Sequence, residues 1–364
     1  MHNIFWQRIS YNKSAFLSVT LLLLYFVVSL GCYILAVDNS ADVNTQIPEI
    51  ALHPPFVSMT FISLQNKDTQ TENRLKKAFF GSNIHTELIP VVSWHEAKDS
   101  IILKKYTGKN QFTGEPLPTE TITLSKSKAL RNKEYKIIRK TFPFGTDAFG
   151  RCVYSRILVG SRISLTVGLS AVLISLTIGI LIGLAGGYYG GKTDTVLMLF
   201  VNTIWSIPTL LLVFAIVLAL GRGVHILYLA IGLTLWVDVA RIVRGQVMSA
   251  KQNVYIDAAR SLGYDNKRIM FRHILPNIIG PILVIAAGNF ATAIILEAGL
   301  SYLGFGVQPP TPSWGNMLNE NYGYALSGYY FLAVIPALTI VLLVLSINIL
   351  GNSLRDYFDV KIDK

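Results

Sequence analysis

Charged side chains are scarce in this sequence of 364 residues. Lys, Arg, Asp and Glu make up 15% of it, whereas hydrophobic residues make up 52%. Soluble domains carry about a quarter charged residues. Sparse charge, together with apolar residues gathered into long runs, indicates burial in lipid rather than around one aqueous core. An ordinary soluble globular protein is therefore excluded.

Cysteine is almost absent, and the two that occur, Cys32 and Cys152, belong to no CxxC pair. A metal or redox centre is therefore not expected, and we predict two independent thiols. Several histidines are scattered without metal-ligand spacing and are predicted to be solvated surface residues, so no metal site is predicted. These histidines are His53, His85, His95 and His225.

A basic stripe interleaved with aromatic residues is also missing. The formal net charge of +11 would otherwise favour a nucleic-acid partner. The basic residues lie instead in loops between apolar runs, which excludes nucleic acid as the expected partner.

What the sequence does contain is six apolar runs long enough to cross a hydrocarbon core of about 30 Å. The first, 15–37, exceeds the roughly 7–15 apolar residues of a signal peptide and is predicted to be an uncleaved span. Pro208 predicts a kink in the third run. The other five runs lie within a predicted membrane domain, 143–353, and cover 164–188, 195–220, 227–243, 278–300 and 331–350.

Residues 38–142 differ in character, because charges and prolines are frequent and no long apolar run occurs. We predict a soluble α+β insertion with strands at 57–64 and 120–124 and a helix at 98–106. It contains no Ser/His/Asp, Cys/His or paired-carboxylate arrangement, so no catalytic residue is predicted.

Lysine and arginine are distributed unevenly between the predicted loops. With the amino terminus in the cytoplasm, the short outward loops contain only Arg222. This asymmetry predicts that the termini, 1–14 and 354–364, are cytoplasmic and that the insertion faces outward. The inward basic residues are Arg8, Lys13, Lys192, Arg241, Arg244, Lys251, Arg260, Lys267, Arg268, Arg272, Arg355, Lys361 and Lys364.

Residues 186–193 match the pattern GxxxxGK[ST], which marks a phosphate-binding loop in other proteins. Such a loop follows a buried strand, whereas this segment lies between two long apolar runs, so nucleotide binding is not expected here. Gly190 and Gly191 predict a tight turn. Three further glycines recur every four residues and predict close approach of a second helix: Gly179, Gly183 and Gly187.

The polar segment 245–277 is predicted to contain a short helix. Asp257 near its start suits the helix dipole, Gly263 ends it with positive φ, and Pro276 ends a second amphipathic piece. Its small residues, on which a partner can pack closely, are Ala258 and Ala259. From these residues alone, a docking helix and an ordinary amphipathic loop helix both remain open.

The same segment resembles the EAA loop of ABC importer permeases, written EAA-x3-G-x9-I-x-L-P. Here Asp replaces the leading Glu and keeps its charge, and the ending His-Ile-Leu-Pro-Asn is typical of the peptide branch. The resemblance implies that the segment couples the chain to an ATPase. The residues that match are Asp257, Ala258, Ala259, Gly263, His273, Leu275 and Pro276.

Further segments resemble the C-type permease subunit of dipeptide, oligopeptide and nickel ABC importers. Residues 144–151 resemble LGTDxxGRD, with Cys152 in place of the final Asp, and 297–304 read EAGLSYLG. The insertion lies outside the resemblance. The other matching segments are 161–165, 187–191, 207–209, 309–315 and 351–356.

The resemblance implies an all-α membrane protein with the six-helix, MetI-like fold of type I ABC importer permeases, plus the inserted α+β region. It implies a multi-pass protein of the bacterial inner membrane that forms half of a path for di- or oligopeptides. The implied partners are a homologous B-type permease, two ABC ATPases and an extracytoplasmic solute-binding protein. ATP and Mg²⁺ would bind to the ATPases, and this chain would be no enzyme. Whether the cargo is a dipeptide, an oligopeptide or nickel stays open.

Polar residues inside the predicted spans are candidates for the translocation path. Asn289 and Thr292 lie deep in the fifth run, and Glu297 lies near its outer end. Asp238 is spaced i, i+3 from Arg241 near the inner end of the fourth run. A charge inside a membrane marks a functional site by default, but a polar contact between helices or subunits is equally open for Glu297 and Asp238.

Two alternatives belong to other classes. A secondary transporter usually shows internal repeats and discontinuous helices, and this sequence has no evident repeat; transport that persists without ATP would favour that class. A membrane-anchored enzyme or sensor would act through the insertion, and uptake that survives its deletion would argue against that class.

Overall fold

The computed structural model describes residues 13–66, 74–82, 86–98, 100–108, 116–125 and 133–359. The described chain divides into two compact units. The first takes in the described parts of 1–26, 164–308 and 339–364, and the second those of 27–163 and 309–338. Several residues used in the predictions lie outside the described residues, namely Arg8, His85, Lys361 and Lys364.

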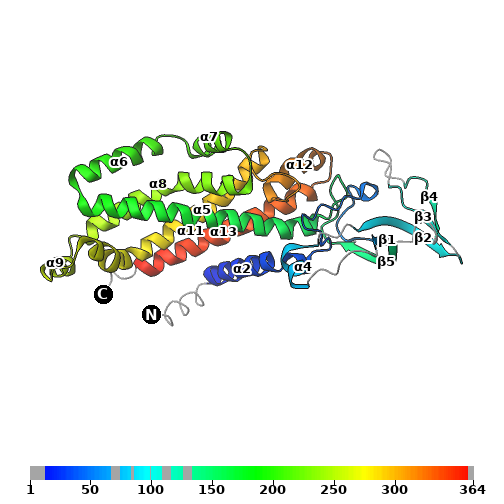
Figure 1. Ribbon diagram of the computed structural model, residues 1–364, viewed down its shortest axis with the longest axis horizontal. Coiled ribbons are helices and arrows are strands. Elements are labelled where there is room, and N and C mark those ends of the chain that lie inside the picture. The colour runs from blue at the N-terminus through cyan, green and yellow to red at the C-terminus, as the bar shows by residue number, and fades with distance from the viewer. Residues whose placement is uncertain are drawn as a thin grey trace. The chain divides into compact units, whose positions relative to one another are not determined.

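Long apolar helices make up most of the described chain (Figure 1). Five of them are long and apolar enough to cross a membrane, and the bent pair α6–α7 supplies a sixth span if it is counted as one. The prediction of an all-α membrane protein with six spans and an inserted α+β region is therefore confirmed. The spans are α2 (Lys13–Leu30), α5 (Val153–Tyr189), α6 (Gly191–Trp205) with α7 (Thr209–Leu220), α8 (Val224–Ala250), α11 (Ile279–Tyr302) and α13 (Phe331–Asp359).

The helices extend beyond the apolar runs that predict them. Helix α5 begins at Val153 rather than at 164, α8 continues to Ala250, and α13 continues to Asp359, so the predicted tail begins as helix. Hydropathy marks only the part of a helix that suits lipid, whereas helical hydrogen bonding continues into water. At the amino end, α2 stops at Leu30 and a short helix, α3 (Cys32–Leu35), follows.

The third apolar run is broken rather than kinked. Helix α6 ends at Trp205 and α7 begins at Thr209, and their axes differ by 88°. Pro208 precedes α7 with φ of −55° and ψ of 127°, which is not helical. Proline disfavours helical conformation in the residue before it and donates no hydrogen bond, which explains why the helix restarts only after Pro208.

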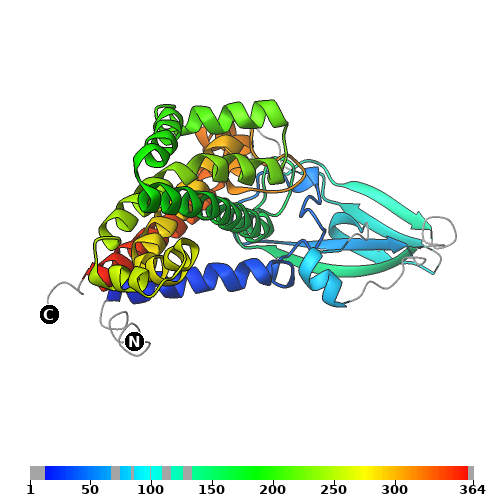
Figure 2. The same ribbon diagram turned by 60° about the vertical axis from the view of Figure 1, so that its left-hand side comes forward.

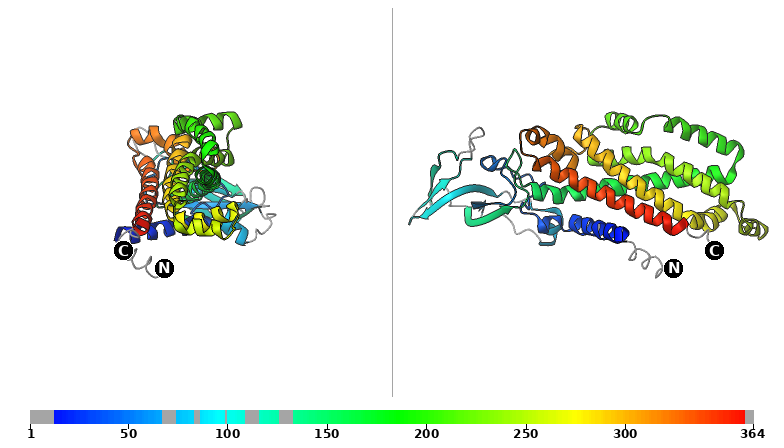
Figure 3. Two further views of the ribbon diagram at one scale, coloured as in Figure 1. Left: turned by 90° about the vertical axis from the view of Figure 1, so that its left-hand side faces the viewer. Right: turned by 180° about the vertical axis from the view of Figure 1, so that it is seen from behind.

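Helix α8 is central to the first unit, where it contacts α6, α7 and α11. Helix α13 runs next to α11 in this unit (Figure 3). A Cβ placed on Gly351 would lie 3.2 Å from Ala287, and one on Gly280 would lie 2.6 Å from the ring of Phe358. The carboxyl end of α13 therefore lies beside the start of α11.

The second unit contains a five-stranded antiparallel sheet with the strand order β4-β3-β2-β1-β5 (Figure 2). The prediction of strands at 57–64 and 120–124 is confirmed by β1 and β4. The strands are β1 (Val57–Asn66), β2 (Glu87–Glu96), β3 (Ser100–Lys105), β4 (Glu120–Ser125) and β5 (Lys133–Phe142), and the helices of this unit include α4 (Arg74–Phe80) and α12 (Trp314–Leu326).

The prediction of a helix at 98–106 is wrong, because this segment forms β3. Ile101 and Leu103 alternate along it and are both fully buried in one apolar cluster with Ile62. Strand β3 lies between β2 and β4, and this pairing on both sides outweighs the local preference of a short segment rich in Lys.

One predicted surface histidine is buried. The ring of His53 lies with Nδ1 3.1 Å from the carbonyl oxygen of Ala51 and Nε2 3.1 Å from the hydroxyl of Tyr106. A buried imidazole needs such partners, and tertiary contacts supply them here. Cys32 and Cys152 are free and buried, as the prediction of two independent thiols requires.

Candidate coupling site and translocation face

The segment predicted to contact an ATPase contains one regular helix, α9 (Val254–Ser261). Asn253 precedes it in extended conformation, and Gly263 follows it with φ of +76°. Residues with a Cβ are strained at such a φ, so glycine suits the end of this helix. Asp257 lies in the first turn, and its Oδ1 accepts a hydrogen bond of 3.2 Å from Arg260, an exposed ion pair that adds little stability.

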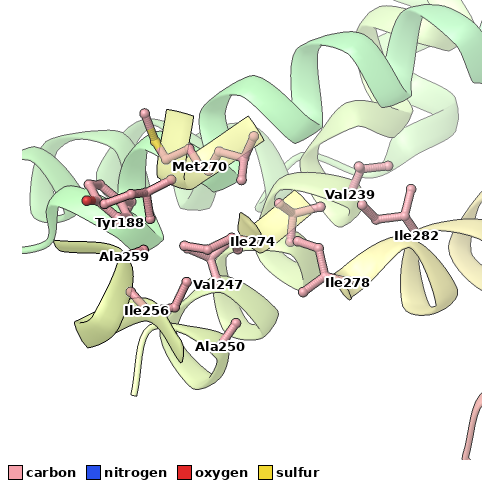
Figure 4. Packing of buried hydrophobic residues seen from close by; sticks show 13 residues of the cluster. Tyr188, Val239, Val247, Ala250, Ile256, Ala259, Met270, Ile274, Ile278 and Ile282 are labelled. Carbon is pink, nitrogen blue, oxygen red and sulfur yellow. The ribbon is translucent and has the colours of Figure 1, made fainter. Parts of the chain in front are cut away.

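One face of α9 packs onto the first unit. Ile256 and Ala259 are buried in an apolar cluster with Val247 of α8 and Ile282 of α11 (Figure 4). Burying a large aliphatic side chain such as Ile256 contributes about 1.5–3 kcal/mol. Helix α9 is therefore held to the ends of the spans and does not hang from them as a free loop.

The opposite face of α9 is apolar and exposed. Val254 is 83% exposed, Leu262 72% and Tyr255 40%. Tyr255, Ala258 and Leu262 lie three and four residues apart and therefore share one side of the helix. An uncovered apolar face of this kind marks a site of protein interaction.

The two alanines that the sequence groups together lie in different environments, because Ala258 is exposed and Ala259 is buried. His273 stacks on the ring of Tyr264 with 5.4 Å between centroids. Of the residues predicted for coupling, Asp257, Ala258, Gly263 and Pro276 are exposed, His273 and Leu275 are partly buried and Ala259 is buried.

The chain leaves regular α-helix between α9 and α11. A π-helical turn covers Ile269–Ile274, and a 3₁₀ turn covers Leu275–Ile278. Pro276 has no N–H to continue the α-helical pattern, and such irregular turns often mark functional positions. The second amphipathic piece thus enters α11 through a change of helix type rather than through a loop.

Polar contacts join this segment to the turn between α5 and α6. Lys251 donates to the carbonyl oxygen of Tyr188 at 2.6 Å, and the Tyr188 hydroxyl donates to Asn266 at 2.8 Å. Nearby, Arg244 of α8 donates to both carboxylate oxygens of Asp194 of α6, each at 2.6 Å. Two-pronged pairs of this kind are strong and directional. A displacement of α9 would therefore reach α5, α6 and α8 together.

The glycines predicted to allow close packing lie on α5 against α8. A Cβ at Gly183 would lie 2.7 Å from the carbonyl oxygen of Ala240, and those at Gly179 and Gly187 would lie 2.5 Å and 2.8 Å from atoms of α8. Side chains have no room at these three positions. The turn that follows joins two helices, so the strand that a phosphate-binding loop requires is replaced by α5.

Glu297 is fully buried between α5 and α11. Its carboxylate accepts hydrogen bonds from the hydroxyls of Ser164, at 2.9 Å, and Ser301, at 2.8 Å. Burial of a carboxylate is tolerated where hydroxyls satisfy it. The geometry therefore favours a contact between helices over a side chain that lines the path.

The two deeper path candidates differ in exposure. Asn289 is buried and donates from Nδ2 to the carbonyl oxygen of Leu235 in α8 at 3.2 Å. Thr292 is exposed, and its hydroxyl donates back to the carbonyl oxygen of Gly288. Of the three predicted path residues, Thr292 is thus the one with an exposed side chain.

Asp238 lies at the middle of α8, which continues to Ala250, and within the apolar run 227–243, in the half of that run that leads toward Arg244. Its side chain is exposed. The guanidinium of Arg241 turns to α6, where it donates to Asn202 at 2.9 Å and lies 4.0 Å from the ring centroid of Trp205. A carboxylate facing hydrocarbon at the centre of a span costs about 2.5–3.5 kcal/mol.

In the second unit, buried charges join the segment before α5 to α12. Asp147 Oδ2 accepts from Arg151 at 2.7 Å and from Arg156 at 2.8 Å. Glu320 Oε2 accepts from the same arginines at 2.5 Å and 2.9 Å. Burial alone would raise the pKa of Glu320, but the charges of Arg156 and Arg151 outweigh it and hold this pKa below its usual range.

Residues 175–364 match the family model described as the binding-protein-dependent transport system inner membrane component. The chain belongs to this family. The resemblance to ABC importer permeases is thereby confirmed. The match begins within α5, so the sheet of this permease lies outside it.

Three relatives of the permease carry transport names. The oligopeptide transport system permease protein OppC of Bacillus subtilis is 40% identical over 61% of this chain and 72% of its own length. The dipeptide transport system permease protein DppC of the same organism is 39% identical over 60% and 68%. The glutathione transport system permease protein GsiD of Escherichia coli O6:K15:H31 is 43% identical over 60% and 72%.

Sequence reasoning missed the ion cluster of this permease, although one signal was present. Glu320 is the single acidic residue between 301 and 330, a stretch without Lys or Arg, so its partners had to come from elsewhere. Arg156 precedes a long apolar run, and a basic residue at such a place usually indicates the interface between membrane and water. Their pairing across 164 positions is visible only in the structure.

Proposed function

We propose that this permease is the C-type subunit of an ATP-driven importer for di- or oligopeptides and that α9 couples it to separate ATPase subunits. The observation that carries this proposal is the two-sided character of α9. Ile256 and Ala259 hold the helix to the spans, whereas Val254, Tyr255 and Leu262 present an uncovered apolar face. A partner that binds this face can push or pull the spans to which the other face is attached.

Peptide cargo is proposed from the relatives. They are named for oligopeptide, dipeptide and glutathione transport, and each of these substrates is a peptide by its chemistry. A separate binding protein would select the cargo, so that partner would determine the length of the peptides that are transported. Nickel is not part of the proposal.

The proposal includes four partners and an orientation. A second, homologous permease would complete the path, two ATPases would bind ATP and Mg²⁺, and an extracytoplasmic binding protein would deliver the peptide. The permease itself would bind no cofactor and catalyse no reaction. Both termini would face the cytoplasm of a bacterium, because basic residues concentrate in the loops on that side. The end of α13 lies beside the start of α11, next to residues 245–277, which we call the coupling segment.

Transport requires two states that bind their ligands differently. Closure of the ATPases would displace α9, and the apolar cluster with the Lys251–Tyr188 contact would carry this displacement into α5, α8 and α11. Small interface shifts of this kind are converted into rigid-body motion because packed cores do not deform continuously.

Ala258→Glu tests the proposal in the assembled transporter. The new charge would lie within the exposed apolar face and leave the buried face unchanged, so we expect loss of ATP-dependent peptide uptake and of ATPase co-purification at unchanged membrane abundance. Ala258→Ser is the matched control and should transport normally. Normal uptake by the Glu variant, or uptake by the permease without any ATPase, would overturn the proposal.

A further inference from the structure

The side of helix α8 that carries Asp238 is open along the second half of the helix. Asp238, Ile242 and Gly245 are exposed and recur at i, i+4 and i+7, so they share a side of the helix. Nothing lies within 4 Å of a Cβ placed on Gly245. Ile231, seven residues before Asp238 on the same side, is fully buried. The open side therefore begins at Asp238.

Helix α11 continues this open surface at the same height. The hydrogen bond from Asn289 to the carbonyl oxygen of Leu235 aligns the two helices about one turn from Asp238. Gly288 and Thr292, on either side of Asn289, are exposed, and nothing lies within 4 Å of a Cβ placed on Gly288. We call the residues Asp238, Gly245, Gly288 and Thr292 the inner polar face.

The depth of Asp238 follows from the length of α8. At 1.5 Å per residue its 27 residues span about 40 Å, and a hydrocarbon core of about 30 Å, wherever it lies along this helix, includes the middle of the helix. Asp238 lies at that middle. Lipid does not solvate a carboxylate at this depth, so the exposed side of Asp238 must face water or another polar group.

Nothing within the described chain neutralises this carboxylate. Among the described residues, no Lys, Arg or His forms an ion pair with Asp238. Arg241, the nearest basic residue in the sequence, donates to Asn202 and stacks on Trp205 instead. The charge of Asp238 is thus available to a cation that comes from outside this chain.

We propose that the inner polar face lines a water-filled part of the translocation path and that Asp238 binds the ammonium group of a peptide in transit. The proposal rests on the proposed function, because it requires that peptides pass along this chain. Every peptide with a free amino terminus carries this cation, whereas its side chains vary in size. The two open glycines leave room for that variation, and an exposed carboxylate binds weakly enough to release its ligand.

The first experiment uses Thr292→Cys as a reporter in the complete transporter, reconstituted in nanodiscs with all its subunits. The native thiols, Cys32 and Cys152, are buried and give little background. We expect a cationic methanethiosulfonate reagent to modify the reporter faster than its anionic counterpart, by about tenfold from the Coulomb attraction of one nearby charge. Asp238→Asn in the same chain should bring the two rates close together. Ile231→Cys, on the same side of α8 but fully buried, is the control and should stay unmodified.

A second experiment measures uptake of trialanine. Asp238→Asn should raise its KM by about two- to fivefold, the scale of an exposed ion pair, and leave subunit assembly unchanged. Equal rates for the two reagents with Asp238 present would overturn the proposal, as would an unreactive reporter in every nucleotide state. Loss of the second permease from the Asn variant would also overturn it, because Asp238 would then be a subunit contact. In each of these cases the intact transporter would still take up peptide with ATP, so the proposed function would stand.

Discussion

The coupling segment and the buried ion cluster hold their surroundings by opposite means. Helix α9 is seated by apolar contacts of Ile256 and Ala259, and its other face is uncovered. The cluster of Asp147, Arg156 and their partners joins α5 to α12 through charges that are almost completely buried, except that the side chain of Glu320 is 20% exposed. Apolar side chains can slide past one another at little cost. Two buried charges that separate, in contrast, each lose the opposite charge that offsets their desolvation. We therefore expect α9 to move during transport and the ion cluster to stay intact.

Arg156→Met tests how much the buried charges contribute to stability. It would leave Asp147 and Glu320 with a single arginine between them, and breaking a buried charge network by removing one partner costs about 3–5 kcal/mol. We expect a large fall in the Tm of the purified subunit in detergent. Lys136→Met, which removes an exposed pair with Glu134, is the control and should change Tm little. Equal effects of the two substitutions would show that the cluster contributes no more than a surface pair.

Ile256→Ala tests how firmly apolar contacts hold α9. The substitution opens a cavity under α9 and should weaken its seating by about 2 kcal/mol, since Ile→Ala changes in cores cost about 2–5 kcal/mol. We expect faster amide hydrogen exchange in 254–262 and reduced uptake, with a smaller change in Tm than for Arg156→Met. Val254→Ala, on the exposed face, is the control and should leave exchange unchanged. Unchanged exchange in the Ile256 variant would mean that α9 is held by other contacts.

Protonation of Glu320 in acid should change the Tm less than either substitution does. The pKa of Glu320 is lowered from its ordinary value of 4.5 in the folded protein, so its ionised form stabilises the fold above that value. This stabilisation should be lost as the pH falls from about 4.5 through the lower folded pKa. Thermal unfolding of the wild-type protein and of Glu320→Gln, recorded between neutral and acid pH, measures it. The wild-type Tm should fall more steeply in acid than that of the variant, and parallel curves would remove Glu320 as the cause.

Apolar runs were sufficient to predict the six spans, because lipid imposes one requirement on every residue of a run. Sequence did not predict the break at Pro208, since proline is tolerated in many membrane helices and only packing decides whether the helix bends or stops. It also misassigned β3, where pairing with two neighbouring strands outweighs local preference. Short strands of an inserted sheet carry a weaker signal than long apolar helices.

The sequence predicted where along the chain the candidate site lies, but not which of its side chains are exposed. The spacing of Asp257, Gly263 and Pro276 is the basis for proposing a coupling role for this segment, but it offers no reason to place Ala258 outside and Ala259 inside. That difference depends on which side of α9 meets Val247 and Ile282. Hydropathy also did not show that α8 continues to Ala250, because the end of this helix includes polar residues that no apolar run registers.

The corner between α6 and α7 restricts what can lie beside it. Ser206, Ile207 and Pro208 are exposed and interrupt the helical pattern. The N–H groups of Ser206 and Ile207 still donate to carbonyl oxygens of α6. Pro208 has no N–H, however, and the last carbonyls of α6 and the first N–H groups of α7 lack the adjoining turn with which a continuous helix would pair them. Irregular backbone at membrane depth persists only where protein or water covers it. This corner is therefore unsuited to an annulus of acyl chains, and in a bilayer a neighbouring subunit or an aqueous vestibule must shield it.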